Sequence, residues 1–123
     1  PPPLVLRGGR QDWGRWRITL ERRTGPVEGG PDRIVLRDTG GELTVAAWDG
    51  TGRLAVENGS RTIKRLFADA GVPIERRREY PAVLLDGTPV AVLKVAVDRA
   101  CRPQENEACL VITWEPLRGE APR

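Results

Sequence analysis

The chain contains no histidine and only two cysteines among its 123 residues. Without an imidazole, no serine or cysteine can be activated by the Ser-His or Cys-His arrangements of nucleophilic catalysis. A zinc site is not expected either, because Cys101 and Cys109 form no Cys-x-x-Cys pair and no histidine can complete the ligand set. The acidic residues lie mostly in turns, and nothing places two of them in one apolar cleft as an acid-base pair. We therefore expect no catalytic residue, metal site or cofactor site in this chain.

The sequence also lacks methionine and any long apolar run. No stretch approaches the roughly 20 apolar residues of a membrane-spanning helix, and the start, Pro-Pro-Pro-Leu-Val, has no signal-peptide pattern. We therefore expect a cytoplasmic protein without a membrane partner. With 39% hydrophobic and 30% charged residues, the composition fits one domain over 4–116, preceded by a stiff linker at 1–3 and followed by a frayed tail at 117–123. The missing initiator methionine leads us to expect a piece of a longer protein.

Cys101 and Cys109 bracket a polar loop, which leaves two redox states open. Across a hairpin the two thiols can form a disulfide in an oxidising compartment, whereas in the cytosol both stay reduced. We expect the reduced state.

Strict alternation of apolar and polar residues predicts a half-buried strand over 16–21. In the last strand, Leu110, Ile112 and Trp114 alternate with Val111, Thr113 and Glu115. The residues expected to face the core are Trp16, Ile18, Leu20, Leu110, Ile112 and Trp114. Trp13 precedes the first strand, and we assign it to core packing or to a lid over a barrel end.

A glycine-rich turn predicts the first β-hairpin. Asp38-Thr39-Gly40-Gly41 separates two short strand patterns, at 33–37 and 43–47, which we expect to pair with each other. A second glycine pair, in 29–32, lies in a loop rich in Gly and Pro. Large charged residues flank this pair where a phosphate-binding loop carries serines, so we interpret the segment as a turn.

The dipeptide Asp86-Gly87 predicts a second β-hairpin, between 82–85 and 90–97. Nearly continuous apolar residues in 90–97 indicate a strand that is covered on both faces. Lys94 interrupts this run. We place its side chain at a sheet edge, and a contact with a ligand stays open as the alternative.

Only the segment 60–70 has the periodicity of a helix. Its apolar residues recur at i, i+3, i+4 and i+7 and form one stripe: Ile63, Leu66, Phe67 and Ala70. Ser60 is the expected N-cap, and Gly71 supplies the left-handed residue that closes a helix before Pro73. Together with roughly seven or eight short strands, this pattern predicts a strand-rich α+β domain with one principal helix.

Positive charge is concentrated beside this helix. Residues 60–78 contain six basic and two acidic residues, whereas the rest of the chain contains fourteen basic and fifteen acidic ones. A local cationic patch on a nearly neutral body favours a polyanionic partner such as nucleic acid. The alternative is a solvated helix face whose arginines serve only solubility.

Spaced residues in 58–97 resemble the C-terminal domain of bacterial tRNA(Ile)-lysidine synthetases. The matching positions are Gly59, Lys64, Phe67, Val72-Pro73, Arg77 and Pro81. Two features depart from the family pattern: Thr62 replaces a residue that is often basic, and the approach to the helix keeps only Arg53 as a cation. The resemblance implies a small β-sandwich or partly open barrel with the helix packed across it, similar to a module of the phenylalanyl-tRNA synthetase β-subunit.

The same resemblance implies an accessory, tRNA-binding role in an ATP-dependent ligase. The chain would help to recognise isoleucine tRNA, in its acceptor-stem region, while lysidine formation at the wobble cytidine takes place in a separate N-terminal domain. The implied partners are tRNA and that catalytic domain, and ATP is implied only for the full-length enzyme. The candidate tRNA-binding residues are Arg53, Arg61, Lys64, Arg65, Arg76, Arg77 and Arg78. Of these, Lys64 and Arg77 carry over by motif position.

Two alternatives stay open. Arg77 can instead bridge the end of the helix to a backbone carbonyl or to Glu79. The whole chain can instead be a non-catalytic protein-interaction domain that uses exposed strand edges and has no nucleic-acid role.

Overall fold

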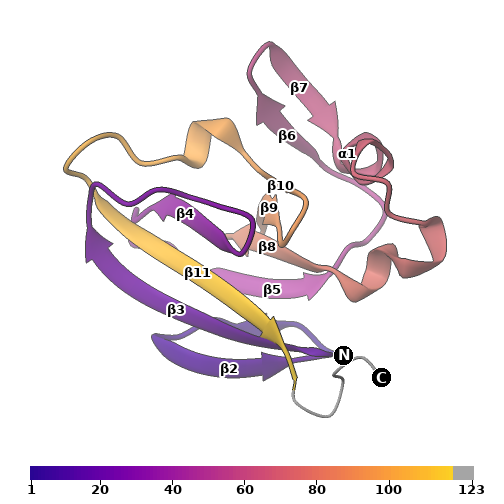
Figure 1. Cartoon of the computed structure of the whole chain (residues 1–123), viewed down its shortest axis with the longest axis horizontal. Helices are drawn as coiled ribbons and strands as arrows, with labels where there is room; N and C mark the ends of the chain where they lie inside the picture. The colour runs from indigo at the N-terminus through magenta and orange to yellow at the C-terminus, as the bar shows by residue number, and fades with distance from the viewer. Residues whose placement is uncertain (118–123) are drawn as a thin grey trace.

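A computed structural model describes residues 1–117, whose strands form two larger sheets and one separate hairpin (Figure 1). The five-stranded sheet runs in the order β1 (Leu4–Val5), β5 (Leu43–Ala47), β8 (Pro81–Leu85), β9 (Thr88–Val92) and β10 (Ala96–Val97). The four-stranded sheet runs in the order β2 (Gly9–Trp13), β3 (Trp16–Thr24), β11 (Ala108–Pro116) and β4 (Arg33–Arg37). The separate hairpin consists of β6 (Arg53–Val56) and β7 (Gly59–Thr62). The described helices are α1 (Ile63–Asp69) and the 3-10 helices η1 (Ile74–Glu79) and η2 (Arg99–Cys101).

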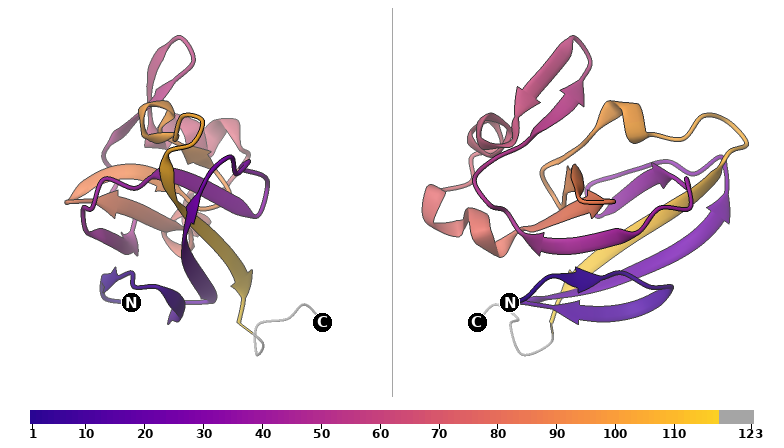
Figure 2. Two further views of the ribbon diagram at one scale, coloured as in Figure 1. Left: turned by 90° about the vertical axis from the view of Figure 1, so that its left-hand side faces the viewer. Right: turned by 180° about the vertical axis from the view of Figure 1, so that it is seen from behind.

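The main core lies between the two larger sheets, which Figure 2 shows from two further sides. Ile18 and Ile112 of the four-stranded sheet and Val45 and Val83 of the five-stranded sheet have no exposed surface. The alternation predicted over 16–21 is therefore confirmed, and Trp13, at 4% exposed, belongs to the core. In β11 Val111 is buried as well, in a small cluster with Val35 and Cys109, so part of this strand is covered on both faces. The sheets are open and do not close into a barrel. The strand-rich α+β class with one principal helix is confirmed.

The hairpin at Asp86-Gly87 is confirmed, but the strand predicted over 90–97 is wrong. Asp86 has φ 48° and Gly87 has φ 86°, the pair of positive angles that a two-residue hairpin turn requires. Beyond β9 the chain turns at Lys94, which has φ 69°, and the N–H of Val95 donates to the carbonyl of Val92 at 3.0 Å. The apolar run is therefore split into β9 and β10, which pair with each other.

The hairpin predicted between 33–37 and 43–47 is also wrong, because the two strands belong to different sheets. β4 pairs with β11, and β5 pairs with β1 and β8. The segment between them crosses from one sheet to the other and is held by Asp86, whose carboxylate accepts the N–H of Glu42 at 3.0 Å. A Cβ on Gly41 would meet this carboxylate at 2.5 Å. Gly41 therefore permits the close approach rather than a hairpin turn.

Helix α1 begins two residues later than expected, and its N-cap is Thr62 rather than Ser60. The Thr62 hydroxyl accepts the N–H of Arg65 at 3.1 Å. Residues 59–62 are extended because they pair with β6. At the other end Gly71 has φ 73°, and Val72 donates its N–H to the carbonyl of Phe67 at 3.0 Å. This closure is a Schellman motif, as Gly71 predicted.

The structure also describes both cysteines and parts of the two ends of the chain. Cys101 and Cys109 are both free thiols. Within 1–117 there is no helix long and apolar enough to cross a membrane, and no cluster of acidic or cysteine side chains is suited to a metal ion. In the expected linker, Pro2 accepts a 2.9 Å hydrogen bond from the indole of Trp13. The expected tail lies outside the described residues except for Leu117, whose N–H donates to the carbonyl of Arg15 at 2.9 Å.

Candidate nucleic-acid interface

The cationic surface is built on a second, smaller core that centres on Phe67. This side chain has no exposed surface and belongs to one apolar cluster with Ile63 of α1 and Leu54 of β6. Its ring centroid lies 5.1 Å from that of Trp48 and 5.9 Å from that of Tyr80. Aromatic pairs at such distances add stability beyond the area that they bury. The cluster fixes α1 against the β6–β7 hairpin and the five-stranded sheet, so the cations outside it have a rigid base.

Arg77 is part of this core. Its side chain is only 8% exposed, and its Nε donates a 3.0 Å hydrogen bond to the carbonyl of Val72. Its guanidinium carbon lies 5.7 Å from the ring centroid of Phe67, within the range of a cation–π contact. Arg77 thus bridges η1 to the end of α1 through a backbone carbonyl, which is the structural alternative that the sequence left open. Arg77 is therefore not part of the exposed cationic surface.

Asp69 organises two of the exposed arginines. Its carboxylate lies 3.0 Å from Nε of Arg65, one helical turn earlier, and 3.8 Å from Nη1 of Arg61 at the end of β7. The Arg61 side chain is 50% exposed and that of Arg65 is 64% exposed. Surface ion pairs of this kind contribute at most about 1 kcal/mol. Both guanidinium groups can therefore exchange the carboxylate for a phosphate.

Glu79 fastens η1 to the four-stranded sheet. One carboxylate oxygen lies 2.7 Å from Nη1 of Arg15, and the other lies 4.0 Å from Nε of Arg76. The backbone carbonyl of Glu79 also accepts a 2.8 Å hydrogen bond from the indole of Trp16. Arg76 and Arg78, both exposed, are therefore carried by an anchored turn.

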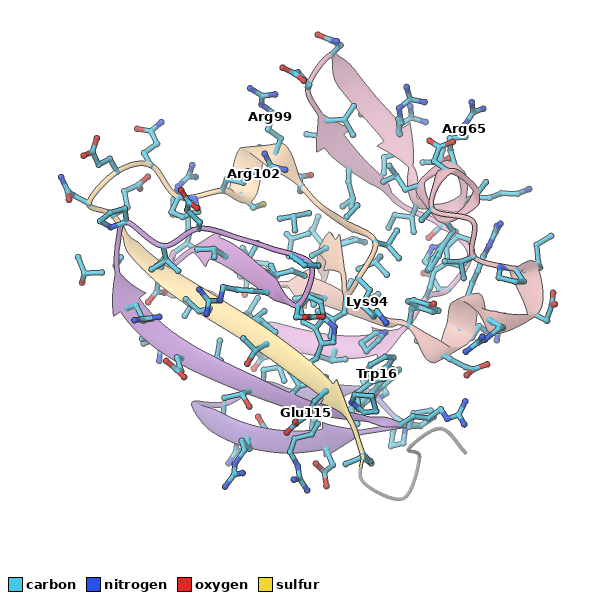
Figure 3. The ribbon with its side chains drawn as sticks, viewed as in Figure 1. Trp16, Arg65, Lys94, Arg99, Arg102 and Glu115 are labelled. Carbon is cyan, nitrogen blue, oxygen red and sulfur yellow. The ribbon has the colours of Figure 1, made fainter. Side chains whose placement is uncertain are left out.

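The remaining candidates are also exposed. Lys64 and Arg78 have no side-chain ion pair or hydrogen bond with any residue in 1–117, and Nε of Arg53 donates to the hydroxyl of Ser60 at 3.1 Å. Figure 3 shows Arg65 on α1, on the side of the helix away from the two larger sheets. We call the six exposed cations the cationic ridge: Arg53, Arg61, Lys64, Arg65, Arg76 and Arg78.

The segment that carries the ridge also carries the whole net charge of the chain. Residues 53–79 contain seven basic and four acidic residues, a net charge of +3, and the net charge of all 123 residues is +3. The other residues balance, with thirteen basic and thirteen acidic side chains. Such an asymmetry attracts a polyanion to one part of the surface.

Comparison with known proteins identifies relatives of the fold. The family model described as "TilS substrate C-terminal domain" matches residues 42–114, from the start of β5 into β11. The solved structure titled "Crystal structure of TILS C-terminal domain" is similar with a TM-score of 0.70 over 96% of this chain and 94% of that chain. Its sequence is 19% identical, so this likeness shows the fold. No curated protein matches the chain.

Proposed function

This chain belongs to the TilS substrate C-terminal domain family, and on that premise we propose that its cationic ridge binds transfer RNA. It is a domain of a tRNA(Ile)-lysidine synthetase. We assign the acceptor-stem region of isoleucine tRNA to the ridge. In this proposal, ATP-dependent activation of the wobble cytidine and the attack of lysine occur in a separate N-terminal domain of the same cytoplasmic enzyme.

The uneven charge is the observation that carries this proposal. Six exposed cations lie on β6, β7, α1 and η1, within the segment 53–79, and the basic and acidic residues outside this segment balance. Arginine and lysine side chains neutralise phosphates without reading sequence, and the released counterions make the affinity depend on salt. A domain that positions a tRNA for chemistry elsewhere needs this kind of contact.

The support under the ridge also suits a folded RNA. An A-form stem is recognised by its shape and its sugar-phosphate backbone, because side chains cannot read its deep, narrow groove. Recognition of a shape requires cations at fixed separations. The Phe67 cluster and the anchors at Arg77 and Glu79 supply these fixed positions.

The test is the salt dependence of tRNA binding, measured by fluorescence anisotropy between about 50 and 200 mM salt. We expect affinity to fall steeply with salt. Lys64→Ala and Arg78→Ala should each reduce the slope of log K against log salt by about 0.7–0.9, the contribution of one phosphate contact.

The matched control is Arg7→Ala, which removes an exposed cation between β1 and β2, outside the ridge. It should leave the slope unchanged. Binding that does not respond to salt, or equal losses from the ridge and control variants, would reject the ridge and favour the protein-interaction alternative.

A further inference from the structure

A cleft of about 580 Å³ lies apart from the ridge, and no ridge residue lines it. It is bordered by β4 and β11, by the segment from β9 to β10, and by the loop that contains Gly29-Gly30-Pro31. Its apolar wall includes Val27, Val35, Val97 and Pro103. The cleft is therefore large enough for one nucleotide and is open to solvent through these loops.

Three cations line this cleft, and no carboxylate does. They are Arg33 of β4, Lys94 of the β9–β10 turn and Arg102, directly after η2. None of the three forms an ion pair with another residue in 1–117. Cations on a protein surface are usually paired with nearby carboxylates. Because these three cations form no such pairs, the cleft is suited to an anion.

Lys94 is held in an unfavourable backbone conformation. Its φ of 69° lies in the left-handed region, which residues other than glycine adopt at a cost. Its Nζ lies 5.5 Å from the ring centroid of Trp16, and Figure 3 shows the two side chains close together. Figure 3 also shows Arg102 at the η2 end of the segment that follows β10. Strained residues of this kind concentrate at ligand sites.

Trp114 adds an unused hydrogen-bond donor. Trp114 lines the cleft, and its Nε1–H is buried without a hydrogen-bond partner among residues 1–117. Buried donors are nearly always paired, because an unpaired one loses its bond with water and gains nothing. The nitrogen has no exposed surface, so an acceptor on a bound molecule reaches it only when a neighbouring side chain moves.

We propose that this cleft binds one unpaired nucleotide, with its phosphate attracted by the cations of the cleft wall, Arg33, Lys94 and Arg102, and its nucleoside against the apolar wall. The Trp114 N–H then donates to an oxygen or ring nitrogen of the nucleoside. The inference rests on the proposed function, because the nucleotide belongs to a single-stranded part of the same RNA. A base-paired stem does not fit a cleft of this volume, whereas single-stranded nucleotides are bound one by one.

The experiment measures binding of a fluorescent single-stranded tetraribonucleotide to the chain, with nucleoside monophosphates as competitors. Arg102→Ala removes one charged contact and should weaken tetranucleotide binding about tenfold. Lys94→Gly should do the same while raising the melting temperature, since glycine accepts the left-handed conformation. Trp114→Phe keeps an aromatic ring but removes the donor, and should weaken binding several-fold. The smaller ring also leaves a cavity in the main core and lowers the melting temperature, so binding is compared well below that temperature.

Arg7→Ala is the control, since Arg7 belongs to neither site, and it should leave tetranucleotide affinity unchanged. Failure of the ridge and failure of the cleft are distinguishable, because the ridge is tested by the salt slope of tRNA binding and the cleft by the loss of tetranucleotide binding in the Arg102 and Trp114 variants. The proposal is overturned if the tetranucleotide does not bind, or if binding is indifferent to the Arg102 and Trp114 variants. If monophosphates bind as tightly as the tetranucleotide, the cleft holds a free nucleotide, and its assignment to RNA is overturned.

Discussion

Replacing Arg77 with methionine should destabilise the fold and leave the salt dependence of RNA binding intact. The variant loses the hydrogen bond from Nε to the carbonyl of Val72 and the cation–π contact with Phe67. A hydrogen bond from a charged donor contributes about 1.5–3 kcal/mol and a cation–π contact about 1 kcal/mol. Methionine restores most of the buried aliphatic volume and removes a buried charge, whose desolvation offsets part of the loss. We expect a net loss of about 2 kcal/mol.

Arg77→Ala extends the series. It also removes two buried methylene groups, Cγ and Cδ, at about 0.8 kcal/mol each, so its total loss should reach about 3.5 kcal/mol. The assay is urea unfolding followed by circular dichroism. With a slope of about 1–3 kcal/mol per molar urea, the methionine variant should shift the midpoint by about 1 M at constant slope.

The same variants distinguish a residue that supports the fold from a residue that contacts RNA phosphate. In the tRNA titration, Arg77→Met should keep the wild-type salt slope, whereas Lys64→Ala should reduce it. An unchanged urea midpoint combined with a reduced salt slope would show that Arg77 contacts phosphate, and the structural interpretation would then be refuted.

Three further predictions concern single residues. Thr62→Ala removes the N-cap of α1 and should lower the free energy of unfolding by about 1 kcal/mol in the same urea assay. The control, Thr39→Ala, lies in an exposed loop and should not change it. Equal effects of the two variants would contradict the assignment of Thr62 as the N-cap. Lys94→Gly relieves a left-handed strain of about 1–2 kcal/mol but loses the cation–π contact with Trp16, about 0.5–1 kcal/mol, so the free energy of unfolding should rise by less than about 1 kcal/mol in the same urea assay. A loss of more than about 1 kcal/mol would contradict the strain. Burial raises the pKa of the Cys101 thiol above its ordinary value, so alkylation of Cys101 should be slower at neutral pH than alkylation of an exposed cysteine and should accelerate in alkaline solution, while buried Cys109 stays protected. Mass spectrometry of the alkylated chain checks both cysteines, and rapid labelling at pH 7 would contradict the shift.

Sequence patterns correctly predicted those turns and helix ends that depend only on neighbouring residues. Asp86-Gly87 provides both positive φ angles of its turn, and Gly71 provides the one that closes α1. The start of α1 was misplaced because Ser60 is as good a cap as Thr62 when the pairing of β7 with β6 is unknown. Partner choice is a long-range property: β4 and β5 have the turn of a hairpin between them but pair with β11 and β8, far away in sequence.

The candidate site could likewise be predicted from the sequence only in part. The sequence located the basic segment, because counting charges requires no fold. It could not distinguish Arg77, which is buried, from Arg76 and Arg78, which are exposed, because the three are consecutive in a 3-10 helix with no apolar pattern of its own. The cleft was out of reach of sequence reasoning, since Arg33, Lys94 and Arg102 come from three segments that only the packing of the sheets brings together. The one available indication was Lys94, which interrupts an apolar run.

The acidic residues of the segment 53–79 do not cancel its positive charge, which remains +3. Asp69 lies between Arg61 and Arg65, and Glu79 lies between Arg15, outside the ridge, and Arg76, so each carboxylate is shared by two guanidinium groups. One negative charge between two positive ones leaves an excess of one positive charge. These ion pairs are exposed and weak, so an anion can replace the carboxylate at little cost. Lys64 and Arg78 form no ion pair within 1–117, so their charges are the first that substitution should remove from any salt-dependent contact.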